Sequence, residues 1–150
     1  MRAEVREVIA DWLLLLGAVA VLVSLFLPWS HQFSRAFAAE WGPTGALRGI
    51  PRDPTAWQVY SVVDVAFAVL VAGLLWVALL GGRLRRLATL IAAVLALAFA
   101  LHARSAPPTR GALLYPTAVA DAPRPGPGET VAIAGLATAI GALLLSFTAE

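Results

Sequence analysis

Four long apolar runs alternate with shorter polar segments along this chain. An α-helix rises about 1.5 Å per residue, so roughly 20 residues cross the hydrocarbon core of a bilayer. All four runs reach or approach this length. The pattern therefore predicts four transmembrane helices, at residues 12–29, 62–80, 87–103 and 131–148.

The segments between the runs predict a hairpin topology. Residues 81–86 form a very short connection, whereas residues 30–61 and 104–130 form longer loops, the second rich in proline. We expect an all-α polytopic membrane protein, a single four-helix domain over residues 1–150 made of two outward-looped hairpins.

Tryptophans bracket the first two runs. On a helix Trp12 and Trp29 are about 26 Å apart, and Trp57 and Trp76 are about 28 Å apart. Both separations match the distance between the two aromatic belts at the surfaces of one bilayer. We therefore expect all four side chains at membrane–water interfaces.

The arginines predict the orientation, because cytoplasmic loops carry an excess of basic residues. Three arginines lie in the short connection at residues 81–86, two precede the first run, and the other six are spread over the longer loops. Both termini are therefore expected in the cytoplasm. The chain has no Lys, and its excess of Ala, Gly, Pro and Arg is typical of GC-rich bacterial coding, so the expected location is a bacterial cytoplasmic (inner) membrane.

Composition narrows the classes of function. The chain is 60% hydrophobic and 13% charged, against about 25% charged in a soluble domain. It has no cysteine, which excludes disulfides, thiolate metal sites and thiol redox chemistry. A net charge of +2 without a dense basic patch away from the membrane gives no reason to expect nucleic-acid binding. No nucleophile motif or phosphate-binding loop occurs, so we expect no enzyme activity.

The first outer loop carries a regular aromatic pattern. Phe33, Phe37 and Trp41 recur every four residues, which predicts one aromatic face of a short amphipathic helix. Ser30 or Ser34 would cap this helix at its start. An exposed aromatic stripe needs a surface that covers it. The outer leaflet, the ends of the protein's own helices and a partner protein all remain open.

Small residues at four-residue steps predict close helix packing in the membrane. Such seams occur in the third and fourth runs, and the notable positions are Ala88, Ala92, Ala96, Ala100, Gly135, Ala139 and Gly141. The same seams suit contacts within the bundle and contacts between copies of the chain.

Two acidic residues adjoin apolar runs. Asp64 with Ser61 forms a capping pattern, and Glu129 precedes the fourth run, where the helix dipole favours an acid. Thr55–Gln58 is a second capping pattern. If the second helix begins there, Asp64 lies about 10 Å below Trp57 and becomes a candidate for proton or cation handling.

His31 and His102 follow the first and third runs, at the same side of the membrane in this topology. They are candidates to ligate a haem or a metal ion together with an acid. The alternative is an ordinary polar contact at the interface. No cofactor is predicted from the sequence itself.

Four features together carry a resemblance to a family: "LFLPWS" at residues 25–30, "VVDVAFAVLVAGLL" at residues 62–75, the arginine-rich "GGRLRR" and the proline-rich second loop. With them the chain resembles small uncharacterised four-span membrane proteins of GC-rich actinobacteria. In that group the first span ends in Leu-Pro-Trp and the second opens with an Asp. The resemblance covers most of the chain, and it implies topology but no activity.

Three functions follow as expectations. The first is a non-enzymatic accessory or assembly subunit, with the lipid bilayer and other membrane subunits, or further copies of itself, as partners. The second is a small homo-oligomeric transporter or ion-handling protein that uses Asp64. The third is a redox subunit that binds haem or a metal through His31 and His102.

Overall fold

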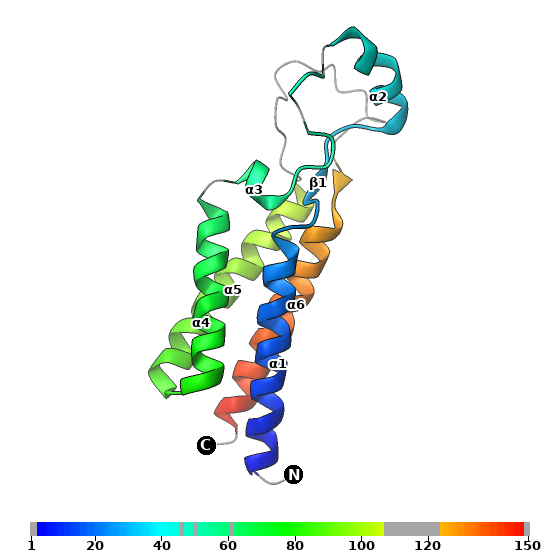
Figure 1. Ribbon diagram of the computed structural model, residues 1–150. Helices are drawn as coiled ribbons and strands as arrows, with labels where there is room; N and C mark the ends of the chain where they lie inside the picture. The colour runs from blue at the N-terminus through cyan, green and yellow to red at the C-terminus, as the bar shows by residue number, and fades with distance from the viewer. Residues whose placement is uncertain (1–2, 46, 50, 61, 107–123, 149–150) are drawn as a thin grey trace.

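A computed structural model describes residues 3–45, 47–49, 51–60, 62–106 and 124–148. In this part of the chain four long helices form one bundle (Figure 1), and they are α1 (Ala3–Ser24), α4 (Val63–Leu80), α5 (Arg83–Ser105) and α6 (Pro127–Phe147). Each is long and apolar enough to cross a membrane. The prediction of a largely helical protein with four such helices is confirmed.

The helices run alternately up and down, so one end of the bundle carries both chain ends and the turn between α4 and α5 (Figure 1). At this terminus end Arg6 Nη1 donates to the carbonyl of Thr148 over 3.2 Å. Arg86 of α5 also reaches Glu7 of α1, with 3.3 Å between Nη2 and Oε1. These contacts join the first, third and fourth long helices of the bundle.

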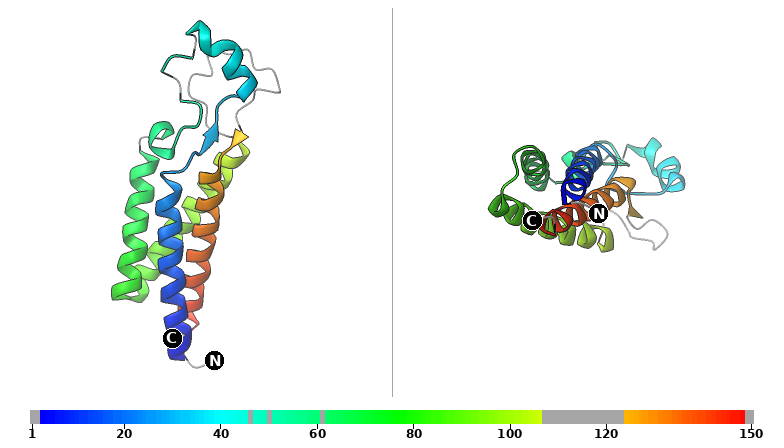
Figure 2. Two further views of the ribbon diagram at one scale, coloured as in Figure 1. Left: turned by 45° about the vertical axis from the view of Figure 1, so that its right-hand side comes forward. Right: turned by 90° about the horizontal axis from the view of Figure 1, so that it is seen from below.

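The opposite end, here called the loop end, carries short elements that form a projecting module (Figures 1 and 2). These elements are β1 (Ser30–His31), α2 (Arg35–Trp41), η1 (Gly42–Thr44), α3 (Ala56–Val59) and β2 (Arg124–Pro125). The strands pair antiparallel, with Ser30 opposite Pro125 and His31 opposite Arg124. Most of the predicted loop 104–130 lies outside the described residues.

The first predicted span differs from α1 at its end. The prediction extends to Trp29, but the helix ends at Ser24. Pro28 has no amide hydrogen, and in a helix its ring would clash with the carbonyl of Ser24, four residues earlier. That carbonyl instead accepts a hydrogen bond of 2.8 Å from Trp29 Nε1. The side chain thus replaces the backbone bond that the proline forbids.

The position of Trp29 differs from the one expected for an aromatic belt. Its side chain is buried at the loop end instead of facing lipid, whereas Trp12, Trp57 and Trp76 are exposed. Phe26, also exposed, lies beside Trp57 with 6.3 Å between the ring centroids. The loop end therefore carries an exposed aromatic pair, Phe26 with Trp57.

The tightest packing joins α1 and α6, which lie side by side in both views of Figure 2. A Cβ added to Gly17 would stand 2.8 Å from the carbonyl oxygen of Gly135 and 2.9 Å from the amide of Ala139. The two backbones thus approach too closely for any side chain at Gly17. Gly141, two residues after Ala139 on α6, is exposed and a Cβ there would meet nothing within 4 Å.

The small-residue seam of α5 lies only partly inside the bundle. Ala100 is buried and Ala96 half-buried, but Ala88 and Ala92 are exposed. The buried positions of α5 are Arg86, Thr89, Ala93, Ala100 and Ala103.

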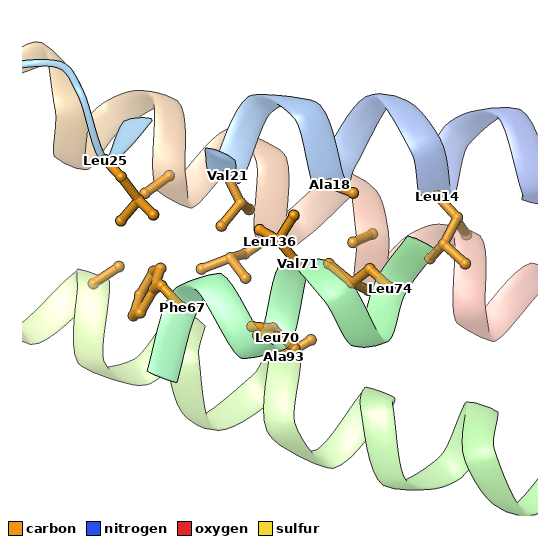
Figure 3. Packing of buried hydrophobic residues seen from close by; sticks show 14 of the residues in the cluster. Leu14, Ala18, Val21, Leu25, Phe67, Leu70, Val71, Leu74, Ala93 and Leu136 are labelled. Atoms are coloured by element: carbon orange, nitrogen blue, oxygen red, sulfur yellow. The ribbon is translucent and has the colours of Figure 1, made fainter. Parts of the chain in front are cut away.

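The middle of the core is mainly aliphatic. Figure 3 shows side chains of α1, α4, α5 and α6 meeting in the middle of the bundle, among them Leu14, Ala18, Val21, Leu70, Val71, Leu74, Ala93 and Leu136.

Candidate functional site

The chain just after α1 is held between two other segments at the loop end. Trp29 donates its amide to the carbonyl of Pro54 over 2.9 Å, and its own carbonyl accepts from the amide of Gly126 over 2.9 Å. The carbonyl of Pro28 accepts from the amide of Gly128 over 2.8 Å. Residues 28–29 therefore fasten the start of α6 to the segment before α3.

The glycines before α6 allow this contact. A Cβ on Gly126 would overlap the Pro28 carbonyl, and one on Gly128 would lie 2.5 Å from Trp29 Cδ1. The sequence "PGPGE" therefore serves close packing against Trp29. Sequence reasoning missed this role, and the alternation of Gly and Pro directly before a span was the available signal.

Trp29 belongs to a closed ring of four aromatic side chains, here called the aromatic cluster. Trp29 lies edge to face with Tyr60 and with Phe67, with 5.7 Å between the ring centroids in each pair. Phe99 completes the ring at 5.3 Å from Tyr60 and 6.1 Å from Phe67. The cluster thus joins the chain after α1 to α4, α5 and the segment before α4.

Asp64 lies beside this cluster because the second capping pattern forms a separate one-turn helix, α3. Gln58 closes its capping box by accepting the Thr55 amide over 3.1 Å. Tyr60 then takes an extended conformation, and α4 begins only at Val63. Asp64 is therefore in the first turn of α4, 1% exposed, and its Oδ2 is buried without a hydrogen-bond partner among the described residues. Ser61, the expected capping partner, lies outside the described residues.

Glu129 occupies the matching position in the first turn of α6. Its side chain is 0% exposed, and neither carboxyl oxygen has a hydrogen-bond partner in the part of the chain that the structure describes. Arg104 lies nearby on α5, but its Nη1 bonds to Thr130 Oγ1 over 3.4 Å and the side chain is exposed.

The charges of both acids act on the hydroxyl of Tyr60. Burial raises the pKa of its hydroxyl to about 12, and the negative charges of Glu129 and Asp64 contribute to this rise. The hydroxyl is thus within electrostatic range of both carboxyl groups. It keeps its proton at neutral pH, so it remains a hydrogen-bond donor.

The two histidines are placed differently. His31 Nδ1 is 2.6 Å from Asp53 Oδ1, and both side chains are largely exposed. His102 is exposed on α5. Among the described residues no group of three or more His, Asp or Glu is arranged to hold a metal ion. Haem or metal binding by His31 and His102 stays a prediction.

Two members of the aromatic stripe, Phe37 and Trp41, lie on α2, and Phe33 lies directly before its cap. Ser34 caps the helix by accepting the Phe37 amide over 3.1 Å. The ring of Phe37 is 6.0 Å from that of Phe33 and 6.1 Å from that of Trp41. Trp41 is 42% exposed, and α2 has no buried residue. In Figures 1 and 2, α2 lies farther from the bundle than α3 does.

The chain thus presents two candidate sites at the loop end: a buried acidic site around Tyr60 and an exposed aromatic stripe on α2. Comparison with known proteins adds no family, since no family model, curated protein or solved structure matches the chain.

Proposed function

We propose that this protein is a non-enzymatic accessory or assembly subunit of a larger complex in the bacterial cytoplasmic membrane. The observation that carries the proposal is the aromatic stripe on α2. Its rings follow one another along one face, with Phe37 beside both Phe33 and Trp41, and Trp41 is 42% exposed. Such a stripe in a projecting segment is typical of a protein interaction site.

The position of α2 favours a protein partner over the lipid surface. In the orientation we propose, both termini and the arginine-rich turn face the cytoplasm and the loop end faces outward. Phe26 and Trp57 then mark the outer interface. Because α2 lies beyond α3 and Trp57, its stripe faces the extramembrane part of another subunit.

Gentle extraction of the tagged protein from its own membranes tests this proposal. We expect native particles that contain other polypeptides, and we expect the variant Phe33→Ser/Phe37→Ser/Trp41→Ser to lose them. The matched control is Arg35→Ser/Glu40→Ser, which changes exposed positions of the same helix and should keep the partners. Clean multiples of the 15.7 kDa chain, or unchanged co-purification of the triple variant, would contradict the proposal.

A second candidate function is ion or proton handling at Asp64. Asp64 and Glu129 are buried, and three of their oxygens have no hydrogen-bond partner among the described residues. This favours ion handling, because ionisable groups in membrane bundles commonly mark ion pathways. In liposomes that contain the purified protein, Asp64→Asn should abolish ion or proton flux. Flux equal to wild type in that variant would remove this candidate.

A further inference from the structure

We infer that the loop end of the bundle holds a proton-binding site formed by the carboxyl groups of Asp64 and Glu129 together with the Tyr60 hydroxyl. The inference deepens the second candidate function by naming the ligand and the groups that hold it. It does not require that the proton crosses the membrane.

The burial of both carboxyl groups is the first step. Asp64 is 1% exposed and Glu129 is 0% exposed, and three of their four oxygens are buried without a hydrogen-bond partner in the described chain. Transfer of an ionised carboxylate into such surroundings is very costly unless a charge or a hydrogen bond compensates it. A bound proton removes the charge and supplies a donor.

Among the described residues, the positive charge that acts on Glu129 is that of Arg104, which is exposed and bonded to Thr130. The last turn of α1 has no basic residue. On α5, the basic groups in the last turn are His102 and Arg104, and both are exposed. His31 of β1 is largely exposed and bound to Asp53, and Arg124 of β2 is exposed. The residue within range of both acids is Tyr60, whose hydroxyl is neutral.

The lining favours a proton over a metal cation. Sodium, calcium and magnesium require several oxygen ligands. Here the rings of Trp29 and Phe99 lie against Tyr60, the ring of Phe67 completes the aromatic cluster, and none of the three supplies an oxygen ligand. No set of three or more His, Asp or Glu in the described residues forms a metal site. A proton needs no coordination shell.

The site nevertheless retains a means to release the proton. Asp64 and Glu129 both lie in the first turn of a helix, where the free amides and the helix dipole stabilise negative charge. Glu129 also follows Gly128, whose amide binds the Pro28 carbonyl. Ionisation there therefore acts on the contact that fastens α6 to the chain leading to α2.

Infrared spectroscopy of the full-length protein in lipid nanodiscs tests the inference. We expect the wild type to show a protonated carboxylic-acid carbonyl band at neutral pH, which decreases at alkaline pH. Glu129→Gln and Asp64→Asn should each reduce this band, and the double variant should remove it. The control Glu40→Gln changes an exposed carboxylate and should leave the band as in wild type.

Thermal unfolding gives a second readout of the same site. The folded protein holds extra protons that the unfolded chain releases, so its melting temperature should fall as pH rises, by about 3 °C per pH unit for each extra proton. The double variant should lack this slope. Absence of the carbonyl band in wild type at neutral pH would overturn the inference. Stabilisation by sodium or calcium at constant ionic strength, lost in the double variant, would overturn it in favour of a metal ion.

The infrared band, the flux and the co-purified partners can each fail independently, so the proton site is tested separately from the two proposed functions. A protein that shows the band but carries no flux retains the proton site and loses the transport function. Loss of partners from the triple α2 variant with an unchanged band bears only on the accessory function.

Discussion

At the residue scale, the absence of a side chain at Gly17 sets the distance between α1 and α6. Its nearest neighbours across the interface are backbone atoms of Gly135 and Ala139. Backbone atoms cannot change rotamer to make room, so an added methyl group must push the helices apart. In lipid, where apolar surfaces gain little from leaving the solvent, close packing of this kind is a main source of helix association.

Gly17→Ala should therefore destabilise the bundle by about 1–3 kcal/mol, the usual cost of overpacking a core. The matched control is Gly141→Ala, where the new Cβ meets nothing within 4 Å and helix propensity favours alanine by about 1 kcal/mol. Unfolding of both variants in mixed micelles measures the difference. Equal stability of the two variants would show that the interface is looser than described.

The sequence identified Asp64 and Glu129 as acids next to apolar runs, but it did not predict their surroundings. The start of α6, which carries Glu129, packs against Trp29, a residue that was expected at the membrane interface. Contacts between residues 28–29, 54–55 and 126–128 hold Trp29 in place. Such contacts join segments far apart in the chain, and neither hydropathy nor spacing within one segment reports them.

At the element scale, the long helices were predictable because a bilayer demands about 20 consecutive apolar residues. Their ends were less predictable, since polar residues continue a helix beyond its apolar part. The third predicted span covers residues 87–103, whereas α5 is Arg83–Ser105. The two-residue strands β1 and β2 left no signal, because alternation cannot be recognised in so short a segment.

The sequence offered two starting points for the second long helix, one at Thr55 and one near Asp64, and the structure has a separate helix at each. The pattern from Thr55 to Gln58 does cap a helix, but that helix ends after one turn at Tyr60. The break brings Asp64 to the start of α4 instead of the interior of a longer helix. The condition for a depth of about 10 Å below Trp57, one continuous helix from Thr55, is therefore not met, while the burial of Asp64 keeps it a functional candidate.

At the scale of the whole molecule, the up-and-down arrangement places both chain ends opposite the projecting module. Length and apolarity establish four helices that can cross a membrane, and the distribution of arginine predicts which end is cytoplasmic. The chain contains no cysteine, so single-cysteine variants report the two ends separately.

We expect Glu40→Cys, in the projecting module, to react with a membrane-impermeant maleimide in intact cells. Arg83→Cys, at the start of α5 beside the turn that follows α4, should react only after the membrane is permeabilised, because we expect it to face the cytoplasm. Both positions are exposed, so accessibility within the protein does not limit either reaction. Labelling of Arg83→Cys in intact cells would reverse the proposed orientation.

The pairing of α1 with α6 also bears on biogenesis. The helix that leaves the ribosome first packs most closely against the last of the four. Until α6 enters the membrane, the small-residue face of α1 around Gly17 lacks its partner. Insertion of α6 thus becomes the step that forms the closest interface of the bundle.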